Sequence, residues 1–205
     1  MVCRHYLKFG ICTDNCPRSS GCILFLQHRD AKEDIDELLH TLCTHEDASM
    51  RNYAAIKLGQ SRDSKISDTL LKQLEVEEDR EVKSHIAFAL GALHEEGAIG
   101  KLVLLLLNED DPLVREYAAI ALGNIGERRV ADTLIQILET DPSTSVRVHA
   151  AIALGKLGGN RAFKSFICAM QEDREVEVRN IAEKVAGLKK KVYSNKNTGN
   201  THSYQ

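Results

Sequence analysis

The stretch VRVHAAIALGKLG, from Val146 to Gly158, decides the fold, because close copies of it recur along most of the chain at one fixed interval. A glycine near the end of each copy marks the interval, since the differences 91−59, 123−91, 155−123 and 187−155 all equal 32. Leucine-rich segments such as GKLVLLLLNED and ADTLIQILETD separate the copies. A unit of this length with two helical segments predicts an α-solenoid.

The spacing of apolar residues inside the motif indicates helix rather than strand. In this copy they fall at i, i+4, i+7, i+8 and i+11, on one face of a helix: Val146, Ala150, Ala153, Leu154 and Leu157. The intervening segments keep the same interval in two apolar columns. These columns are Leu38, Leu70, Leu102, Leu134 and Phe166, and Leu42, Leu74, Leu106, Leu138 and Met170. We therefore predict an all-α, right-handed α-solenoid of about five 32-residue helix pairs, because a single pair cannot bury its apolar faces alone.

Composition divides the chain into three expected units. Residues 1–29 form a cysteine-rich module, residues 30–188 the solenoid, and residues 189–205 a basic and polar tail without apolar periodicity, which we expect to be disordered. Asp30 and Glu33 predict a capped helix from about Ala31 to Cys43. The repeated glycine suits the left-handed end of a helix, with the true end up to one turn later. In the last copy, polar residues replace Ala and Ile, as a terminal repeat requires.

Overall composition limits the possible functions. Of 205 residues, 43% are hydrophobic and 28% charged, and the net charge of −3 argues against bulk attraction to nucleic acid. The chain shows neither an apolar run of membrane-spanning length nor the pattern of a signal peptide. We expect a cytoplasmic protein without membrane contact, and a nuclear location stays open.

Four cysteines are concentrated near the start of the chain: Cys3, Cys12, Cys16 and Cys22. In a reducing compartment this cluster predicts a metal site before disulfides. Four thiolates at short spacing suit tetrahedral zinc, and an iron–sulfur cluster has a similar ligand set and stays an alternative. His28 is the alternative to Cys22 as the fourth ligand.

The run CRHYLKFGIC, from Cys3 to Cys12, resembles the opening of a CCCH zinc finger. The chain departs from that family further on, since Cys16 comes earlier than the family's third ligand and Ser20 stands where the family has histidine. The resemblance implies single-stranded RNA binding through Arg4, Tyr6 and Phe9. The alternative is a metal-clamped cap over the open start of the solenoid.

The repeated pattern VRxxAAxALGxLG resembles HEAT repeats, most closely the short HEAT-like repeats of phycobilisome lyases. The resemblance implies that the helices carrying this pattern line a concave recognition surface. A column of that helix carries Tyr53, His85, Tyr117 and His149, and Phe88 follows His85 on the same helical face. One hypothesis makes these five residues a groove that binds a protein partner. The other makes them filling between stacked helices, and the sequence favours neither.

A second column is charged and has a structural interpretation. Acids stand four positions before the basic residues Arg51, Lys83, Arg115 and Arg179. We predict that these acids and bases pair to tie turn to helix and repeat to repeat. Arg115 and Arg147 are therefore not expected to bind a ligand.

Enzymatic function finds little support in the sequence. Deoxyhypusine hydroxylase, an enzyme of HEAT-like architecture, holds iron with His-Glu pairs just before the AAxALG stretch. The matching positions here include Ser84-His85 and Val148-His149, and none is His-Glu. We therefore predict no catalytic residue and interpret the chain as a non-enzymatic adaptor for a protein partner. A lyase, a lyase subunit or an iron–sulfur protein is the alternative.

Overall fold

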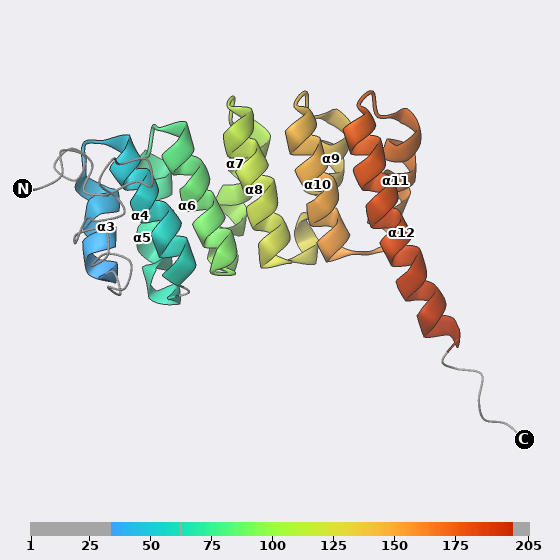
Figure 1. Cartoon of the computed structure of the whole chain (residues 1–205), viewed down its shortest axis with the longest axis horizontal. Helices are drawn as coiled ribbons and strands as arrows, with labels where there is room; N and C mark the ends of the chain where they lie inside the picture. Colours follow the sequence, from blue (N-terminus) through green and yellow to red (C-terminus); the bar gives the residue numbers. More distant parts are fainter. Residues whose placement is uncertain (1–33, 62, 199–205) are drawn as a thin grey trace, which may run out of the picture.

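The computed structural model describes residues 34–61 and 63–198, with the side chains of Ser64 and of residues 188–198 left aside. All regular structure in this part is helical, and the α-helices follow one another as five pairs (Figure 1). The pairs are α3 (Ile35–Thr44) with α4 (Ala48–Ser61), α5 (Ser67–Val76) with α6 (Arg80–Ala92), α7 (Ile99–Asn108) with α8 (Pro112–Ile125), α9 (Ala131–Thr140) with α10 (Thr144–Leu157), and α11 (Asn160–Glu172) with α12 (Val176–Thr198). The predicted all-helical solenoid of five pairs is confirmed for these residues, and its hand stays a prediction.

The helices form two layers, and neighbouring helices pack more closely in one layer than in the other. Each even-numbered helix packs along the next even-numbered helix, whereas the odd-numbered helices pack mainly on their own partners. The leucine columns of the odd helices fill the space between the layers, and Leu42, Leu70 and Leu102 are fully buried. The core therefore runs the length of the described array without interruption.

The repeated glycines of α4 to α10 lie in the last helical turn and are not the left-handed residues themselves, so the predicted alternative of an end up to one turn later is the one that the structure shows. A Cβ on Gly91 would lie 2.5 Å from the Cα of Ala121, and one on Gly123 would lie 2.7 Å from the Cβ of Ala153. The glycine is needed because the alanine of the next even helix rests against its backbone. The left-handed helix end instead falls at Gly126, one turn after Gly123, with φ of 82°.

Both ends of the described array differ from expectation. The cap of α3 is Asp34, whose carboxylate accepts from the N–H of Asp36, so the helix begins later than the predicted Ala31. Asp30 and Glu33 lie outside the described residues. At the other end α12 continues to Thr198, so residues 189–198 are helical although the sequence lacks apolar periodicity there. The division of the chain into three functional units stays a prediction.

The glycine contact predicts opposite effects of one substitution at two places. Gly91→Ala should lower the free energy of unfolding by about 2 kcal/mol, because the added methyl group forces α6 and α8 apart. Gly187→Ala should raise it by about 1 kcal/mol, since alanine favours helix over glycine and nothing lies within 4 Å of the new Cβ. Urea unfolding followed by circular dichroism measures both. A stabilised Gly91→Ala would contradict the packing role.

Candidate functional site

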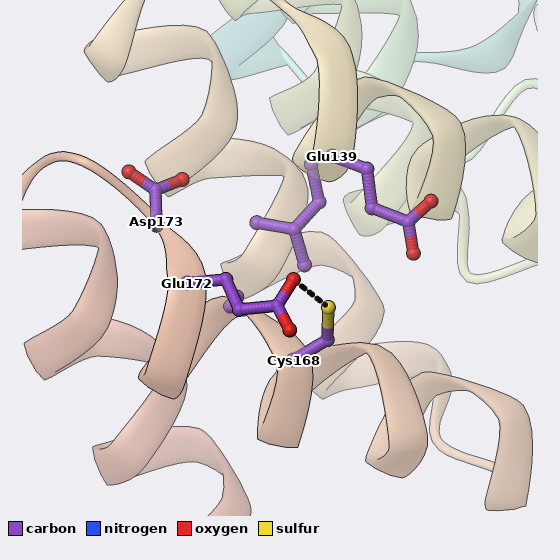
Figure 2. Close-up of a pocket in the computed structure, with 6 residues that line it drawn as sticks. Glu139, Cys168, Glu172 and Asp173 are labelled. Carbon is purple, nitrogen blue, oxygen red and sulfur yellow. Dashed lines mark hydrogen bonds between the residues drawn. The ribbon is translucent and has the colours of Figure 1, made fainter.

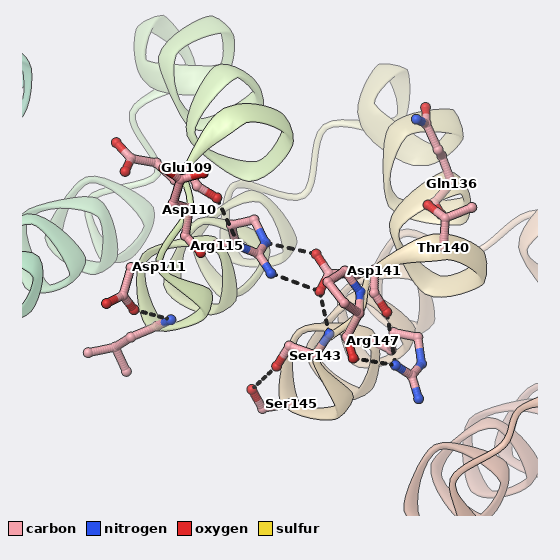
Figure 3. Close-up of polar contacts among 12 residues, drawn as sticks. Glu109, Asp110, Asp111, Arg115, Gln136, Thr140, Asp141, Ser143, Ser145 and Arg147 are labelled. Carbon is pink, nitrogen blue, oxygen red and sulfur yellow. Dashed lines mark hydrogen bonds and ion pairs between the residues drawn. The ribbon is translucent and has the colours of Figure 1, made fainter.

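A row of bidentate ion pairs joins neighbouring repeats. Arg115 donates from Nε and Nη2 to the carboxylate of Asp141, at 2.8 and 3.1 Å (Figure 3). Arg147 repeats this contact with Asp173, at 2.9 and 3.0 Å. Arg51 does so with Glu77, and Lys83 donates to Glu109 at 3.1 Å. Each acid lies 26 residues after its base and belongs to the following repeat.

The same arginines close the turns of their own repeats. Nη1 of Arg115 donates to the carbonyl oxygens of Glu109 and Asp110, both at 2.8 Å. The predicted pairing with the acid four positions earlier was wrong, because that acid caps the even helix instead. Asp111, for example, accepts from the N–H of Leu113 at 2.8 Å. The prediction that the row ties turn to helix and repeat to repeat is confirmed, but with different partners.

Burial and hydrogen bonding set the charge state of this row. Burial alone would raise the pKa of Asp173, but hydrogen bonds from Arg147 and from the N–H of Glu175 outweigh it and lower that pKa. Hydrogen bonding to Asp141 raises the pKa of Arg115 against the effect of burial. Both groups therefore stay ionised at neutral pH. Their hydrogen bonds go to protein groups, which gives the row a structural role.

The predicted partner-binding residues lie on the even layer and touch one another across helices. The rings of His85 and Tyr117 meet edge-on, with centroids 5.2 Å apart, and Phe88 lies 6.0 Å from Tyr117. Tyr53, His85, Tyr117 and His149 are half-buried, and Phe88 is 39% exposed. The structure thus brings His85, Phe88 and Tyr117 into contact. Tyr53 and His149 stand at the equivalent position of the neighbouring even helices, and all five side chains are partly accessible to solvent. We refer to these five residues as the aromatic row.

The histidines of the aromatic row have a defined hydrogen-bonding state. Nδ1 of His85 lies 2.9 Å from the carbonyl oxygen of Glu81, and Nδ1 of His149 lies 3.0 Å from that of Ser145. A carbonyl oxygen only accepts, so both Nδ1 atoms must carry the proton. In the neutral ring Nε2 is then an acceptor. The Glu116 carboxylate also lies 3.3 Å from Nδ1 of His149.

The odd layer carries a surface pocket that the sequence did not predict. It has a volume of about 320 Å³ and lies between α9 and α11, with Glu139, Cys168 and Glu172 in its wall (Figure 2). The Sγ of Cys168 donates to Glu172 at 3.3 Å, and this hydrogen bond raises the pKa of the thiol. A thiol in this state is a poor nucleophile. Of the acidic residues that line the pocket, Glu139 and Glu172 stand at positions where the repeats carry no consistent acid, whereas Asp173 belongs to the ion-pair row.

The predicted metal and RNA residues lie outside the described part of the chain. They are Cys3, Cys12, Cys16, Cys22 and His28 for metal, and Arg4, Tyr6 and Phe9 for RNA. Within residues 34–61 and 63–198, no three histidine, cysteine or acidic side chains lie together as metal ligands. Among the described helices, none combines the length and apolar composition needed to cross a membrane.

Comparison with known proteins places the fold. Residues 99–187 match the family model for HEAT repeats, and the stacked helix pairs of the described residues agree with that match. A similar solved structure is the complex of CpcE and CpcF of phycocyanin lyase from Nostoc sp. PCC7120, with a TM-score of 0.64 and 26% sequence identity. The match covers 76% of this chain and 64% of that one.

A second similar structure is human deoxyhypusine hydroxylase in complex with glycerol, with a TM-score of 0.53 and 20% identity, covering 74% of this chain and 61% of that one. At this identity the likeness shows the fold alone. The chain spans less than two thirds of the length of either structure. No curated protein sequence matches it.

The ion-pair row predicts a sharp contrast between two arginines. Arg115→Ala should lower the free energy of unfolding by about 3 kcal/mol, because it leaves the buried carboxylate of Asp141 without its charged partner. Arg80, whose side chain is 63% exposed and pairs with Asp111, is the control. Arg80→Ala should change stability by less than about 1 kcal/mol. Equal losses in the two variants, measured by urea unfolding, would contradict the structural role of the row.

Proposed function

We propose that the chain is a non-enzymatic scaffold that binds a segment of a protein partner across the even-numbered helices. The observation that carries this proposal is the aromatic row, which stays partly exposed in the middle of an otherwise closely packed layer. In α6, the Phe88 ring is 39% exposed where filling between helices would bury it. Surfaces that bind proteins are enriched in such accessible aromatic side chains.

The geometry of the layer supports an elongated partner. Even helices approach one another more closely than odd helices do, so the even layer is the inner side of any curvature of the stack. The aromatic row crosses four successive even helices, α4 to α10, with one member of its main column on each. The half-buried Ile56, Ile120 and Ile152 stand at the position of Phe88 in their own repeats. A segment lying across the helices would therefore meet apolar and aromatic groups at regular intervals.

Polar groups on this surface indicate the chemistry of the partner. The imidazole rings of His85 and His149 would favour a partner with polar hydrogen-bonding groups beside its apolar side chains. The Glu116 carboxylate lies next to His149, which would add a preference for basic side chains. An amphipathic segment with apolar anchors and a basic edge fits these features.

Likeness to known structures also supports a protein partner. The similar lyase structure is a complex of two proteins, CpcE and CpcF. It also favours a second candidate function, that of a lyase subunit. The described thiols contribute little to that candidate, because burial raises the pKa of Cys43 and hydrogen bonding to Glu172 raises that of Cys168. An assay of phycocyanin lyase activity, with and without the chain, tests it directly.

The scaffold proposal predicts which exposed apolar side chain matters. Phe88→Ala combined with His149→Ala should reduce retention of the partner by about tenfold or more, because aromatic anchors carry much of the energy of an interface. Leu104→Ala is the matched control, since Leu104 is 58% exposed but lies on α7 of the odd layer. Proteins retained by the immobilised chain are identified once and then titrated against wild type and both variants.

Two readings of that titration separate the hypotheses for the aromatic row. Reduced affinity at an unchanged melting temperature supports the binding surface. A sharply lowered melting temperature with unchanged affinity per folded molecule would mean that the row is filling between helices. Equal loss in the Leu104→Ala control would place the partner on the other layer.

We further propose that Cys3, Cys12, Cys16 and Cys22 bind zinc. The support is their spacing in the sequence, since thiolates this close together can form a tetrahedral site. Metal binding would supply the free energy that orders a segment too short to hold its own apolar core. Contact with single-stranded RNA through Arg4, Tyr6 and Phe9 belongs to the same proposal, and capping of the solenoid is the alternative.

The zinc proposal predicts the metal content and the effect of losing one ligand. Protein purified without oxygen should contain about one zinc per chain and little iron, whereas visible absorption with iron would indicate an iron–sulfur cluster. Cys12→Ser should lose the zinc but keep most of the helical circular dichroism, because α3 has its own cap at Asp34. Single-stranded RNA is then titrated into wild type and into a zinc-loaded Arg4→Ala, Tyr6→Ala variant. No binding by zinc-loaded wild type would leave only the cap.

A further inference from the structure

Each junction between inner repeats is made by two features of an even helix. One is a glycine whose backbone receives a small side chain of the next even helix, as Gly91 receives Ala121. The other is a basic side chain that reaches a carboxylate in the turn before the next even helix, as Arg115 reaches Asp141. Both features lie on the side of the helix that faces the following repeat. We call this side the forward face.

The last helix, α12, keeps both features on its forward face. Gly187 corresponds to Gly155 of the preceding repeat, but among the described residues no atom beyond its own stretch of helix lies within 4 Å of where its Cβ would be. Arg179 corresponds to Arg147 of the preceding repeat, and its Nη1 closes the turn by donating to the carbonyl oxygen of Asp173. In Arg115 and Arg147, Nε and Nη2 bind a carboxylate of the next repeat. In Arg179 these two nitrogens make no ion pair within the described residues.

The forward face of α12 is also open to solvent. Val176 is 58% exposed, and Glu183 and Gly187 are exposed as well. In the inner repeats the residues equivalent to Glu183 are Ala87, Ala119 and Ala151, and all three are fully buried. Figure 1 places α11 and α12 at the C-terminal end of the array. The end of the array is therefore half of a junction that the molecule itself forms between its inner repeats.

We propose that this forward face is a second docking surface, which receives a helix pair of another protein chain that brings a carboxylate to Arg179. The junctions of Arg51, Arg115 and Arg147 show the geometry, in which two guanidinium nitrogens meet the two carboxylate oxygens. A bidentate pair of this kind fixes orientation as well as charge. A small residue of the docked helix would lie against Gly187, as Ala121 lies against Gly91.

A second copy of this chain is a poor occupant. If a second copy stacked head to tail on α12, its first repeat would place His45 beside Arg179. The other repeats have an acid at that position: Glu77, Glu109, Asp141 or Asp173. The first repeat would also offer Lys57 where the other repeats offer Ala89, Ala121, Ala153 or Val185 to the glycine. Bringing a histidine to a guanidinium and a long lysine against a glycine removes both contacts. Glu183 adds a preference for a partner with a basic side chain at its edge.

The test uses the full chain and a defined probe. The probe is a synthetic peptide of this protein's own fourth repeat, residues 127–158, with its two helices covalently stapled together and a fluorescent label attached. It carries Asp141 and Ala153, which already meet Arg115 and Gly123 in the array. Fluorescence anisotropy should show binding to wild type that Arg179→Ala weakens by about tenfold. Glu183→Ala should strengthen binding, since it restores the alanine of the inner repeats.

Three controls make the outcome decisive. Gly187→Leu should abolish probe binding while leaving the melting temperature unchanged or higher, because no atom of the described neighbouring elements lies within 4 Å of the new Cβ. Asp141→Asn in the probe should weaken binding to wild type but add little to the effect of Arg179→Ala. Phe88→Ala, on the aromatic row, should have no effect, which separates this surface from the scaffold proposal.

Either of two results would overturn the inference. One is a helical probe that binds wild type, Arg179→Ala and Gly187→Leu alike, or binds none of them. The other is self-association of the chain that Arg179→Ala abolishes, measured by sedimentation. That result would make a second copy, rather than another protein, the occupant of the forward face.

Discussion

The contact between a glycine of one even helix and a small side chain of the next determines much of this architecture. Because Gly91 and Gly123 carry no Cβ, Ala121 and Ala153 can rest directly on their backbones. No comparable contact draws the described odd helices together, so the two layers differ in closeness. Close approach in the even layer also brings the outward residues of successive helices near one another, which is why Tyr117 can touch both His85 and Phe88.

Glycine–alanine contacts bury little apolar surface, so they leave the relative position of two repeats weakly specified. The arginine row supplies that specificity. Removing Arg115 and Asp141 from water is costly, but the guanidinium makes two hydrogen bonds to the carboxylate and two to carbonyl groups of its own turn. The arrangement satisfies these groups only when both repeats are in register. We infer that the buried charge pairs select one stacking geometry more than they add stability.

Sequence alone predicted the repeat, its length, its helices and most of the core, because these follow from apolar spacing. It failed where a residue's partner lies in another repeat. Gly91 does lie in the last turn of its helix, but its contact with Ala121 is what requires a glycine there. Arg115 has a plausible acid one turn earlier in Asp111. The true partner of Arg115 is Asp141, which belongs to the following repeat. Acids recur at the position of Asp141 in other repeats, but they stand 26 residues after the basic side chains, so no short-range sequence pattern connects the two columns. The aromatic row was visible as a column, whereas its edge-on contacts required the distance between helices.

Repetition itself separates structure from function in this chain. Every junction needs the same parts, so a residue type that returns in each copy, such as the glycine or the base at Arg115, is explained by stacking. Positions at which the copies differ are not explained in that way. Phe88 replaces the isoleucine of the neighbouring repeats without being buried, and tyrosine alternates with histidine along the aromatic row. Stacking would be served as well or better by the residue that the other copies use. Under the scaffold proposal, these departures lie on the surface where a partner, rather than the next repeat, determines the side chain.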